Sequence, residues 1–204
     1  MNIGLYFGTF NPIHVGHLII ANYMANFQGL DQVWLVVSPQ NPLKEKAGLL
    51  SDFHRLSLVK AAIEENPKLR ASDVEFKLPI PSYTVTTLAY LKEKHPEHNF
   101  SLSRGEDNLR NFHKWFNHEV ILRNHEIYVY PRVVTIQEEE EIHANGALIE
   151  NPFAQHPHVH ICSDAPVMRI SASFIRQAIK ERKDISYLLT EPVHQYIEEM
   201  HFYR

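Results

Sequence analysis

The sequence predicts an α/β fold, in which a doubly wound and mainly parallel sheet carries helices on both faces. Apolar runs typical of buried strands alternate with segments of helical periodicity along most of the chain. The first strand-like run ends at Gly8 and a helix-like segment follows it, which is the repeating unit of a parallel sheet. With 204 residues, 44% of them hydrophobic, the chain suffices for one sizeable core and is short for two.

Each element of this alternation has its own signal. Strands are predicted where short runs are rich in β-branched and aromatic residues, as in Gln32 to Val37. Helices are predicted where apolar residues recur every three or four positions, as in Val15 to Phe27. The predicted strands are 3–7, 32–37, 71–76, 99–104, 126–130 and 158–161. The predicted helices are 15–27, 52–63, 84–94, 119–124, 173–180 and 192–200, with an exposed loop that contains proline and glycine at 38–50.

Composition and charge limit the classes of function. We expect one domain over residues 1–204, with a C-terminal helical part at about 170–204 packed on the sheet. A formal net charge of -4 argues against a nucleic-acid binder, which would carry a basic excess. The single cysteine, Cys162, excludes an internal disulfide, and the apolar run at the N-terminus is far shorter than the roughly 20 residues that span a bilayer. These features predict a cytoplasmic protein without a membrane partner and leave a homo-oligomer open.

The most informative segment, Gly8 to His17, lies between the first strand and the first helix. In a parallel sheet, ligands bind at the carboxyl ends of strands, where helix N-termini offer unpaired N–H groups and partial positive charge to phosphates. Gly8 and Gly16 would let the backbone approach a ligand closely. His14 and His17, three positions apart, would share one face of the helix start. A lone histidine here would be a helix-end or core residue, whereas this pair beside glycines favours an anion site.

The spacing of these residues is also that of a known signature. The pattern Gly8-x-Phe10-x-Pro12-x-His14-x-Gly16-His17 resembles the signature of the nucleotidyltransferase superfamily, whose members transfer nucleotidyl groups from nucleoside triphosphates. The resemblance implies a Rossmann-like fold in which both histidines contact the triphosphate of ATP. It also implies ATP-binding roles for Gly8, Thr9, Phe10 and Gly16.

A second segment, Arg169 to Arg176, places two serines and an arginine at a predicted helix start. Taken alone, Ser171 would be a helix N-cap and Arg176 a solvated surface residue. The segment resembles the I-S-x-x-x-[IV]-R element of the same superfamily. This resemblance implies that Ser171 and Arg176 bind the triphosphate and that Ile170 belongs to the ATP site.

The loop after the second predicted strand holds a further basic candidate. A lysine in a loop is usually a solubilising charge. In the family that the chain resembles, a lysine in this loop, ahead of a helix with an arginine, contacts phosphate. Lys44 is therefore predicted to be a catalytic residue, with Arg55 as the weaker candidate.

The central part of the chain distinguishes between subfamilies. Pro81 to Leu88 resembles the P-S-Y-T-x-x-T-L element of nicotinate mononucleotide adenylyltransferases. The resemblance implies that Ser82, Tyr83 and Thr84 bind this substrate, whose carboxylate is held by backbone amides. A helix N-terminus capped by Thr84 would suit that role.

A neighbouring stretch, Gly105 to Trp115, resembles the G-x-D-x-x-x-x-x-x-x-W stretch of the same family. The resemblance implies that Trp115 stacks on the pyridine ring and that Gly105 and Asp107 lie near the ribose and adenosine of ATP. From the residues alone, Trp115 would be a core aromatic and Asp107 a helix cap. Arg104 departs from the family, which usually has apolar strand residues here. Since a buried unpaired arginine is costly, we expect it to reach solvent or an anion, or the strand to be distorted.

Two other features are interpreted as structural. The alternating histidines in His156 to His160 would face one side of a strand, and no cysteine or carboxylate at metal-site spacing accompanies them. The acidic run Glu138 to Glu141 is interpreted as a solvated surface.

The resemblances together imply transfer of an adenylyl group from ATP to nicotinate mononucleotide, with release of pyrophosphate. The predicted catalytic residues are His14, His17, Lys44 and Arg176. Mg²⁺ is expected on the substrate phosphates, with no metal site made by the protein. Phosphopantetheine and nicotinamide mononucleotide are alternative acceptors, and a non-catalytic nucleotide-binding module is the alternative of another class.

Overall fold

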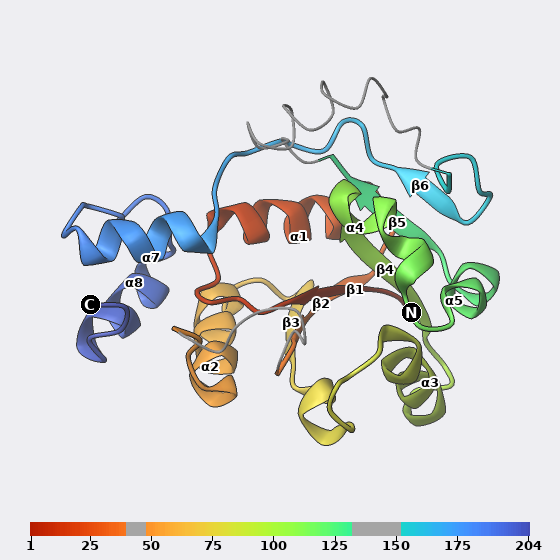
Figure 1. Ribbon diagram of the computed structural model, residues 1–204, viewed down its shortest axis with the longest axis horizontal. Coiled ribbons are helices and arrows are strands. Elements are labelled where there is room, and N and C mark those ends of the chain that lie inside the picture. Colours follow the sequence, from red (N-terminus) through yellow and green to blue (C-terminus); the bar gives the residue numbers. More distant parts are fainter. Residues whose placement is uncertain (40–47, 132–151) are drawn as a thin grey trace.

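The computed structural model describes residues 1–39, 48–131 and 152–204, whose strands form one parallel sheet (Figure 1). The strands are β1 (Asn2–Gly8), β2 (Gln32–Val37), β3 (Leu69–Ser72), β4 (Asn99–Gly105), β5 (Ile127–Tyr130) and β6 (Val159–Ile161). They lie in the order β3-β2-β1-β4-β5-β6, and every neighbouring pair is parallel. This order confirms the predicted doubly wound fold, and it reverses direction between β1 and β4.

Helices cover both faces of the sheet (Figure 1). They are α1 (Val15–Phe27), α2 (Asp52–Ile63), α3 (Thr84–Lys94), α4 (Glu106–Arg110), α5 (His118–Asn124), α7 (Ala172–Lys180) and α8 (Glu191–Glu199), with the 3-10 helices η1 (Val74–Lys77) and η2 (Phe112–Lys114). Buried residues of α1 and α2 share one core layer, and those of α3, α4 and α5 share the other.

The alternation of side chains along the strands separates these two core layers. On β2, Leu35 packs in the layer of α1 and α2, whereas Trp34 packs in the layer of α3 and α5. On β1, Tyr6 belongs to the first layer and Phe7 packs against the second. Two adjacent residues at the carboxyl end of β1 therefore face opposite sides of the sheet.

Most predicted elements are confirmed to within two residues at each end, but two regions differ. The strand predicted at 71–76 is β3 at Leu69–Ser72, followed by η1. The chain turns there because the Ser72 hydroxyl accepts the N–H of Val74 and the carbonyl of Asp73 accepts the N–H of Phe76. The helices α4 and η2 are absent from the prediction, because five and three residues are too few to show a helical period.

The C-terminal helices α7 and α8 lie together at one end of the molecule (Figure 1). Ile175 of α7 and Val193 and Ile197 of α8 belong to the same buried cluster as α1 and α2, and α8 packs against α2. The single domain over 1–204 stays a prediction. No helix in the described part of the chain has both the length and the apolar character needed to cross a membrane.

Candidate active site

The candidate site lies at the carboxyl edge of the sheet, where β1 and β4 are neighbours and the strand order reverses. The loop after β1 leads into α1, and Gly105 at the end of β4 leads into α4. Such a switch point opens a crevice between the two loops, and ligands of doubly wound sheets bind there. The sheet therefore brings the first predicted segment and Gly105 to one place.

His14 and His17 stack on each other at the start of α1. Their ring centroids are 3.7 Å apart and their planes differ by 26°. The backbone N–H of His14 donates to Nδ1 of His17 at 3.3 Å, so the neutral His17 ring carries its proton on Nε2. Nδ1 of His14 is buried and has no hydrogen-bond partner among the described residues. The pair thus offers an N–H donor and an unpaired ring nitrogen beside a helix N-terminus.

Burial keeps both imidazoles neutral at pH 7. It lowers the pKa of His14 from 6.5 to about 4. Burial, together with the neighbouring His14, lowers the pKa of His17 well below its ordinary value. A bound anion would favour the charged forms and raise both pKa values. The pair is therefore suited to take up a proton when a polyphosphate binds.

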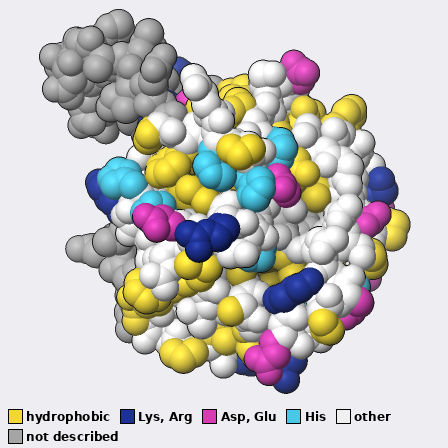
Figure 2. Space-filling view, turned by 90° about the vertical axis from the view of Figure 1, so that its right-hand side faces the viewer, with side chains coloured by type: hydrophobic (Ala, Val, Ile, Leu, Met, Phe, Trp, Pro, Cys, Tyr) yellow, Lys and Arg dark blue, Asp and Glu magenta, His cyan; other side chains and the backbone are white. Residues whose placement is uncertain are grey.

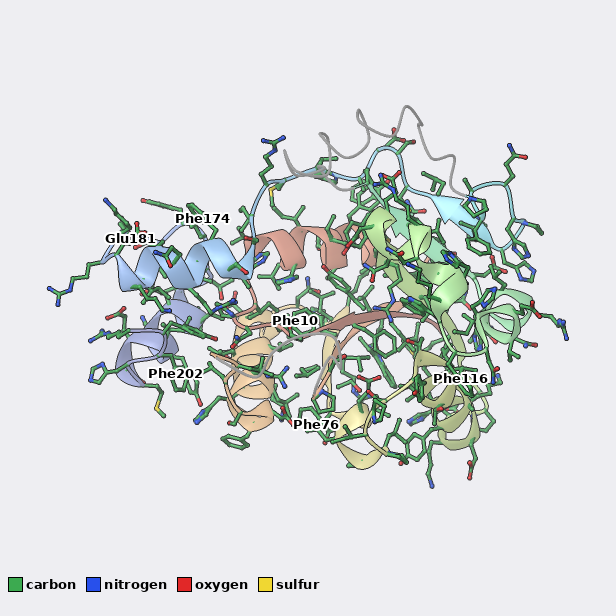
Figure 3. The ribbon with its side chains drawn as sticks, in the orientation of Figure 1. Phe10, Phe76, Phe116, Phe174, Glu181 and Phe202 are labelled. Carbon is green, nitrogen blue, oxygen red and sulfur yellow. The ribbon has the colours of Figure 1, made fainter. Side chains whose placement is uncertain are left out.

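Gly8 and Gly16 are required by close contacts with aromatic rings. A Cβ at Gly16 would lie 3.0 Å from ring atoms of His14, and one at Gly8 would lie 2.7 Å from the ring of Phe10. Phe10 lies in the interior (Figure 3), and its backbone is in the left-handed region at φ +45°. Its ring meets that of His17 at 5.1 Å between centroids. The two glycines thus leave the space in which the signature loop packs its rings.

The second predicted segment reaches the same place from the other end of the chain. Ile170 adjoins the start of α1, since a Cβ built at Gly16 would lie 3.6 Å from the Cβ of Ile170. Nη1 of Arg176 donates to the backbone carbonyl of Asn11 at 2.8 Å. Ser171 is the N-cap of α7, and its hydroxyl accepts a backbone N–H of the first turn at 3.2 Å. The structure therefore brings the two motif segments together.

Asn11 connects the signature loop to distant parts of the chain, and the sequence analysis does not single it out. Its side-chain oxygen accepts the N–H of Leu50 at 3.2 Å and the hydroxyl of Tyr203 at 2.7 Å. Its amide donates to the carbonyl of Gly48 at 2.9 Å. Asparagine is common in loops, and these partners are 37 to 192 residues away, so no local pattern could reveal this role.

Arg55 is not a phosphate contact, so the weaker prediction from the sequence is wrong. Its side chain is fully buried. It donates to one carboxylate and four backbone carbonyls: Asp52, Leu50 at 3.1 Å, Thr9 at 2.6 Å, Ser38 at 2.8 Å and Pro39 at 3.3 Å. A guanidinium has five N–H donors, and all of them are used within the protein. Arg55 instead positions the loops that follow β1 and β2.

The residues predicted to bind the mononucleotide lie at the start of α3. Tyr83 is the N-cap and Thr84 the first helical residue, so the cap predicted at Thr84 is wrong, because Tyr83 still has the extended backbone of a cap. The Thr84 hydroxyl accepts a hydrogen bond from Nη2 of Arg104 at 3.3 Å. The exposed ring of Tyr83 lies 5.0 Å from that of Phe116, which is labelled in Figure 3. Ser82, which precedes Tyr83, is half-buried.

Arg104 lies over two aromatic rings. Its guanidinium carbon is 4.5 Å from the ring centroid of Phe7 and 4.6 Å from that of Trp115. The strand is not distorted, because β4 pairs in regular parallel register with β1 and β5. The half-buried cation is therefore accommodated by ring faces, an arrangement that the sequence analysis does not consider. Trp115 is half-buried at the edge of the core layer.

Gly105 and Asp107 lie close together in space at the start of α4. A Cβ at Gly105 would lie 2.5 Å from Oδ1 of Asp107. Gly105 is the N-cap of α4 and Asp107 lies in its first turn, so Asp107 is not the cap. Lys44 and the acidic run Glu138 to Glu141 lie outside the described residues, and their interpretations stay predictions.

Histidines gather on the face that carries α5 and β6 (Figure 2). Since β6 covers only Val159–Ile161, His156, which the prediction placed on the strand face, lies outside the strand, and His158 directly precedes it. Nδ1 of His158 bonds to a carbonyl of α5 at 2.7 Å, and Nε2 of His160 pairs with Glu126 at 2.5 Å. Nδ1 of His156 accepts the N–H of His158 at 3.2 Å. These rings are thus engaged within the protein.

A group with metal-ligand geometry lies in the turn between α3 and β4, away from the site. The ligand atoms of His95, Glu97 and His98 lie within 4.8 Å of one another. The Glu97 carboxylate lies 3.7 Å and 3.3 Å from ring nitrogens of the two histidines. These distances between Glu97 and the two histidines are the polar contacts described for this cluster.

Comparison with known proteins identifies the family. A family model described as cytidylyltransferase-like matches residues 5–178. A "Probable nicotinate-nucleotide adenylyltransferase" of Flavobacterium johnsoniae is 55% identical over 204 residues and covers 100% of both chains. One of Bacteroides fragilis is 44% identical over 194 residues, 95% of this chain and 90% of the other. The chain belongs to the nicotinate-nucleotide adenylyltransferases of the cytidylyltransferase-like family.

A solved structure of another nicotinate-nucleotide adenylyltransferase shows the same fold. The nicotinic acid mononucleotide adenylyltransferase of Plasmodium falciparum, complexed with NaAD, matches with a TM-score of 0.73 and 19% identity. The match covers 99% of this chain and 97% of the other. At this identity the likeness concerns the fold, and it confirms the Rossmann-like architecture. The roles of individual site residues stay predictions.

We expect Arg55→Met to destabilise the protein by about 3 to 5 kcal/mol, because the substitution leaves buried carbonyls and Asp52 without a donor. Urea unfolding at pH 7 measures the change. Arg123→Met, at an exposed position of α5, serves as the control and should change stability by at most about 0.5 kcal/mol. An Arg55→Met protein within 1 kcal/mol of wild type, on the order of a single neutral hydrogen bond, would contradict the positioning role.

His14 should make stability depend on pH. Its pKa is about 4 in the folded protein and 6.5 when unfolded, so the unfolded chain binds the proton more readily between these values. The contribution of neutral His14 to the free energy of unfolding is complete above pH 6.5 and is lost as the pH falls towards 4. Between pH 7 and pH 5, wild type should lose about 2 kcal/mol more than His14→Gln. Urea unfolding at both pH values measures the loss. If wild type and His14→Gln lose the same free energy of unfolding between pH 7 and pH 5, the imidazole is not buried as a neutral group.

Proposed function

We propose that the chain transfers the adenylyl group of ATP to nicotinate mononucleotide and releases pyrophosphate. One observation carries the proposal: the segment of His14 and His17 and the segment of Ile170 to Arg176 meet at the N-terminus of α1. A helix N-terminus with imidazole and guanidinium donors fits a triphosphate. The acceptor is supported by relatives that are named nicotinate-nucleotide adenylyltransferases at 55% identity over the full chain.

The reaction needs alignment and charge stabilisation more than a base. The 5'-phosphate of a mononucleotide has a second pKa of about 6 and is largely dianionic at pH 7, so it attacks the α-phosphorus unaided. The bond from the α-phosphorus to the bridging oxygen breaks, and pyrophosphate leaves with its electron pair. Donors fixed around the triphosphate hold it in line and stabilise the charge that develops on the leaving oxygens. His14, His17, Lys44, Ser171 and Arg176 are proposed to supply them.

The remaining predicted residues are proposed to shape the two substrate sites. The backbone around the signature loop and α4 would receive ATP through Gly8, Thr9, Phe10, Gly16, Gly105, Asp107 and Ile170. The start of α3 and the ring of Trp115 would receive the mononucleotide, through Ser82, Tyr83, Thr84 and Trp115. These two sets lie at the same carboxyl edge of the sheet, as a reaction between the two substrates requires.

Mg²⁺ is proposed to enter with ATP. The ion prefers oxygen ligands, whereas the two side chains stacked at the start of α1 offer imidazole nitrogens. The residues therefore fit an ion held by triphosphate oxygens and water, which would neutralise phosphate charge when bound. A cytoplasmic location and a homo-oligomer stay predictions.

The direct test is to mix the protein with Mg-ATP and one acceptor at a time and to measure pyrophosphate. Nicotinate mononucleotide should give rapid release, with nicotinate adenine dinucleotide as the second product. Nicotinamide mononucleotide and phosphopantetheine are the comparison acceptors. Faster release with phosphopantetheine would move the chain to another activity of the superfamily, and no release with any acceptor would favour a non-catalytic nucleotide-binding module.

His17→Ala should lower turnover by about 100-fold or more, the scale for loss of one donor to a developing oxyanion. The reason is that Nδ1 of His17 is engaged by the His14 N–H, which leaves Nε2–H for the triphosphate. Initial rates of pyrophosphate release measure the change, with far-UV circular dichroism to verify folding. His160→Ala, on the exposed side of β6, is the matched control and should keep wild-type turnover. Near-normal rates in His17→Ala would remove this residue from the mechanism.

A further inference from the structure

We propose that Arg104 binds the carboxylate of the acceptor nucleotide and so makes the enzyme prefer the acid mononucleotide to the amide. The inference rests on the proposed function and deepens it, since it assigns a specificity-determining residue to the acceptor site. It starts from the presence of Arg104 at the carboxyl end of β4, where the family usually has apolar strand residues.

Three side chains fix the position of the Arg104 guanidinium. Phe7 and Trp115 contact it through their rings at 4.5 and 4.6 Å, and the Thr84 hydroxyl accepts a bond from Nη2 at 3.3 Å. A ring contact stabilises the charge of a guanidinium but supplies no oxygen acceptor for its N–H donors. The cation is thus held by two aromatic rings and by Thr84 at the start of α3.

The donors of Arg104 are largely unused. Nε is buried without a hydrogen-bond partner among the described residues, and the bond to Thr84 accounts for one of the five N–H groups. Leaving a buried donor of a charged group unpaired is costly. By contrast, all five donors of Arg55 have acceptors within the protein. An arginine left in this state is suited to an anion that arrives from outside.

The surroundings keep Arg104 charged without pairing it. Burial lowers the pKa of Arg104 to about 10, and the nearby Tyr130, Glu75, Tyr6 and Asp107 offset part of that effect, so the group stays a cation at neutral pH. Glu75 is buried and accepts the Thr87 hydroxyl at 3.0 Å. Among the described residues, no carboxylate forms an ion pair with Arg104. Its charge therefore remains available to a ligand.

The position of Arg104 indicates which anionic group it meets. Tyr6 lies beside the His17 ring, 6.1 Å between centroids, whereas Phe7 contacts Arg104 and packs on the other face of the sheet. The reacting 5'-phosphate must approach the triphosphate beside the histidines. The opposite end of the acceptor, which carries the ring substituent, then lies towards Arg104. Nicotinate offers a carboxylate there, a two-oxygen partner that a guanidinium binds through two parallel hydrogen bonds.

The test compares the two mononucleotides in Arg104→Met, a variant of similar length without charge. The ratio of kcat/KM for the acid to kcat/KM for the amide should fall by about 10- to 100-fold, the worth of a charge-assisted hydrogen bond. The fall should come from the acid, while kcat/KM for the amide and the KM for ATP stay within about twofold, because neither binds the lost charge. Arg70→Met is the matched control: it removes an arginine that lies 4.6 Å over Trp34, outside the site, and should leave the ratio unchanged.

Two results would overturn the inference. An unchanged ratio with both mononucleotides weakened would mean that Arg104 serves a group that they share, and an unchanged ratio with neither weakened would mean that it serves packing alone. If Arg104→Met does not fold, Arg104→Gln replaces it with the same expected fall. Calorimetric titration of each mononucleotide separates this inference from the proposed function. Acid binding that depends on Arg104 without turnover would refute the activity and keep the inference, whereas no acid binding to wild type would refute both.

Discussion

The buried guanidinium of Arg55 is the interaction on which the geometry of the site depends. Loops at the carboxyl edge of a parallel sheet leave the ladder and carry backbone carbonyls that need donors when they are buried. Arg55 supplies donors to the carbonyls of Thr9 and Ser38, which directly follow β1 and β2. The carboxylate of Asp52 offsets its charge, so the cost of burial is shared between partners with good geometry. Arg55 therefore fixes the position of the signature loop, and the loop in turn positions the stacked histidines.

The sheet also brings two different sets of side chains to one edge. Adjacent strand residues face opposite sides, so Tyr6 belongs with the histidines and Phe7 with Arg104. The stacked histidines and the rings around Arg104 thus lie beside two adjacent residues of β1 that face opposite sides of the sheet. Under the proposed function, these two environments would receive the two substrates.

The sequence predicts the fold well where the signal is local. The helices Val15–Phe27 and Thr84–Lys94 agree with their predicted bounds, because apolar periodicity and flanking residues determine them. The histidine pair is found from its spacing, its flanking glycines and its place between a strand and a helix, all of which are local. The functions of Arg55 and Asn11 could not be predicted, since an arginine on a helix and an asparagine in a loop look the same whether they bind a ligand or backbone carbonyls. Their partners are set by tertiary packing, and the same holds for the rings around Arg104.

The bonds of Asn11 to both Arg176 and Tyr203 have a consequence for the order of events during synthesis. A ribosome releases the chain from its N-terminus, so the imidazoles leave the exit tunnel early and the parts that complete their surroundings leave last. A prematurely terminated product would contain the histidines but lack the arginine, and its asparagine would have lost two partners. The contacts that connect the loop after β1 to the C-terminal segment therefore form only once residues 176 to 203 have been synthesised.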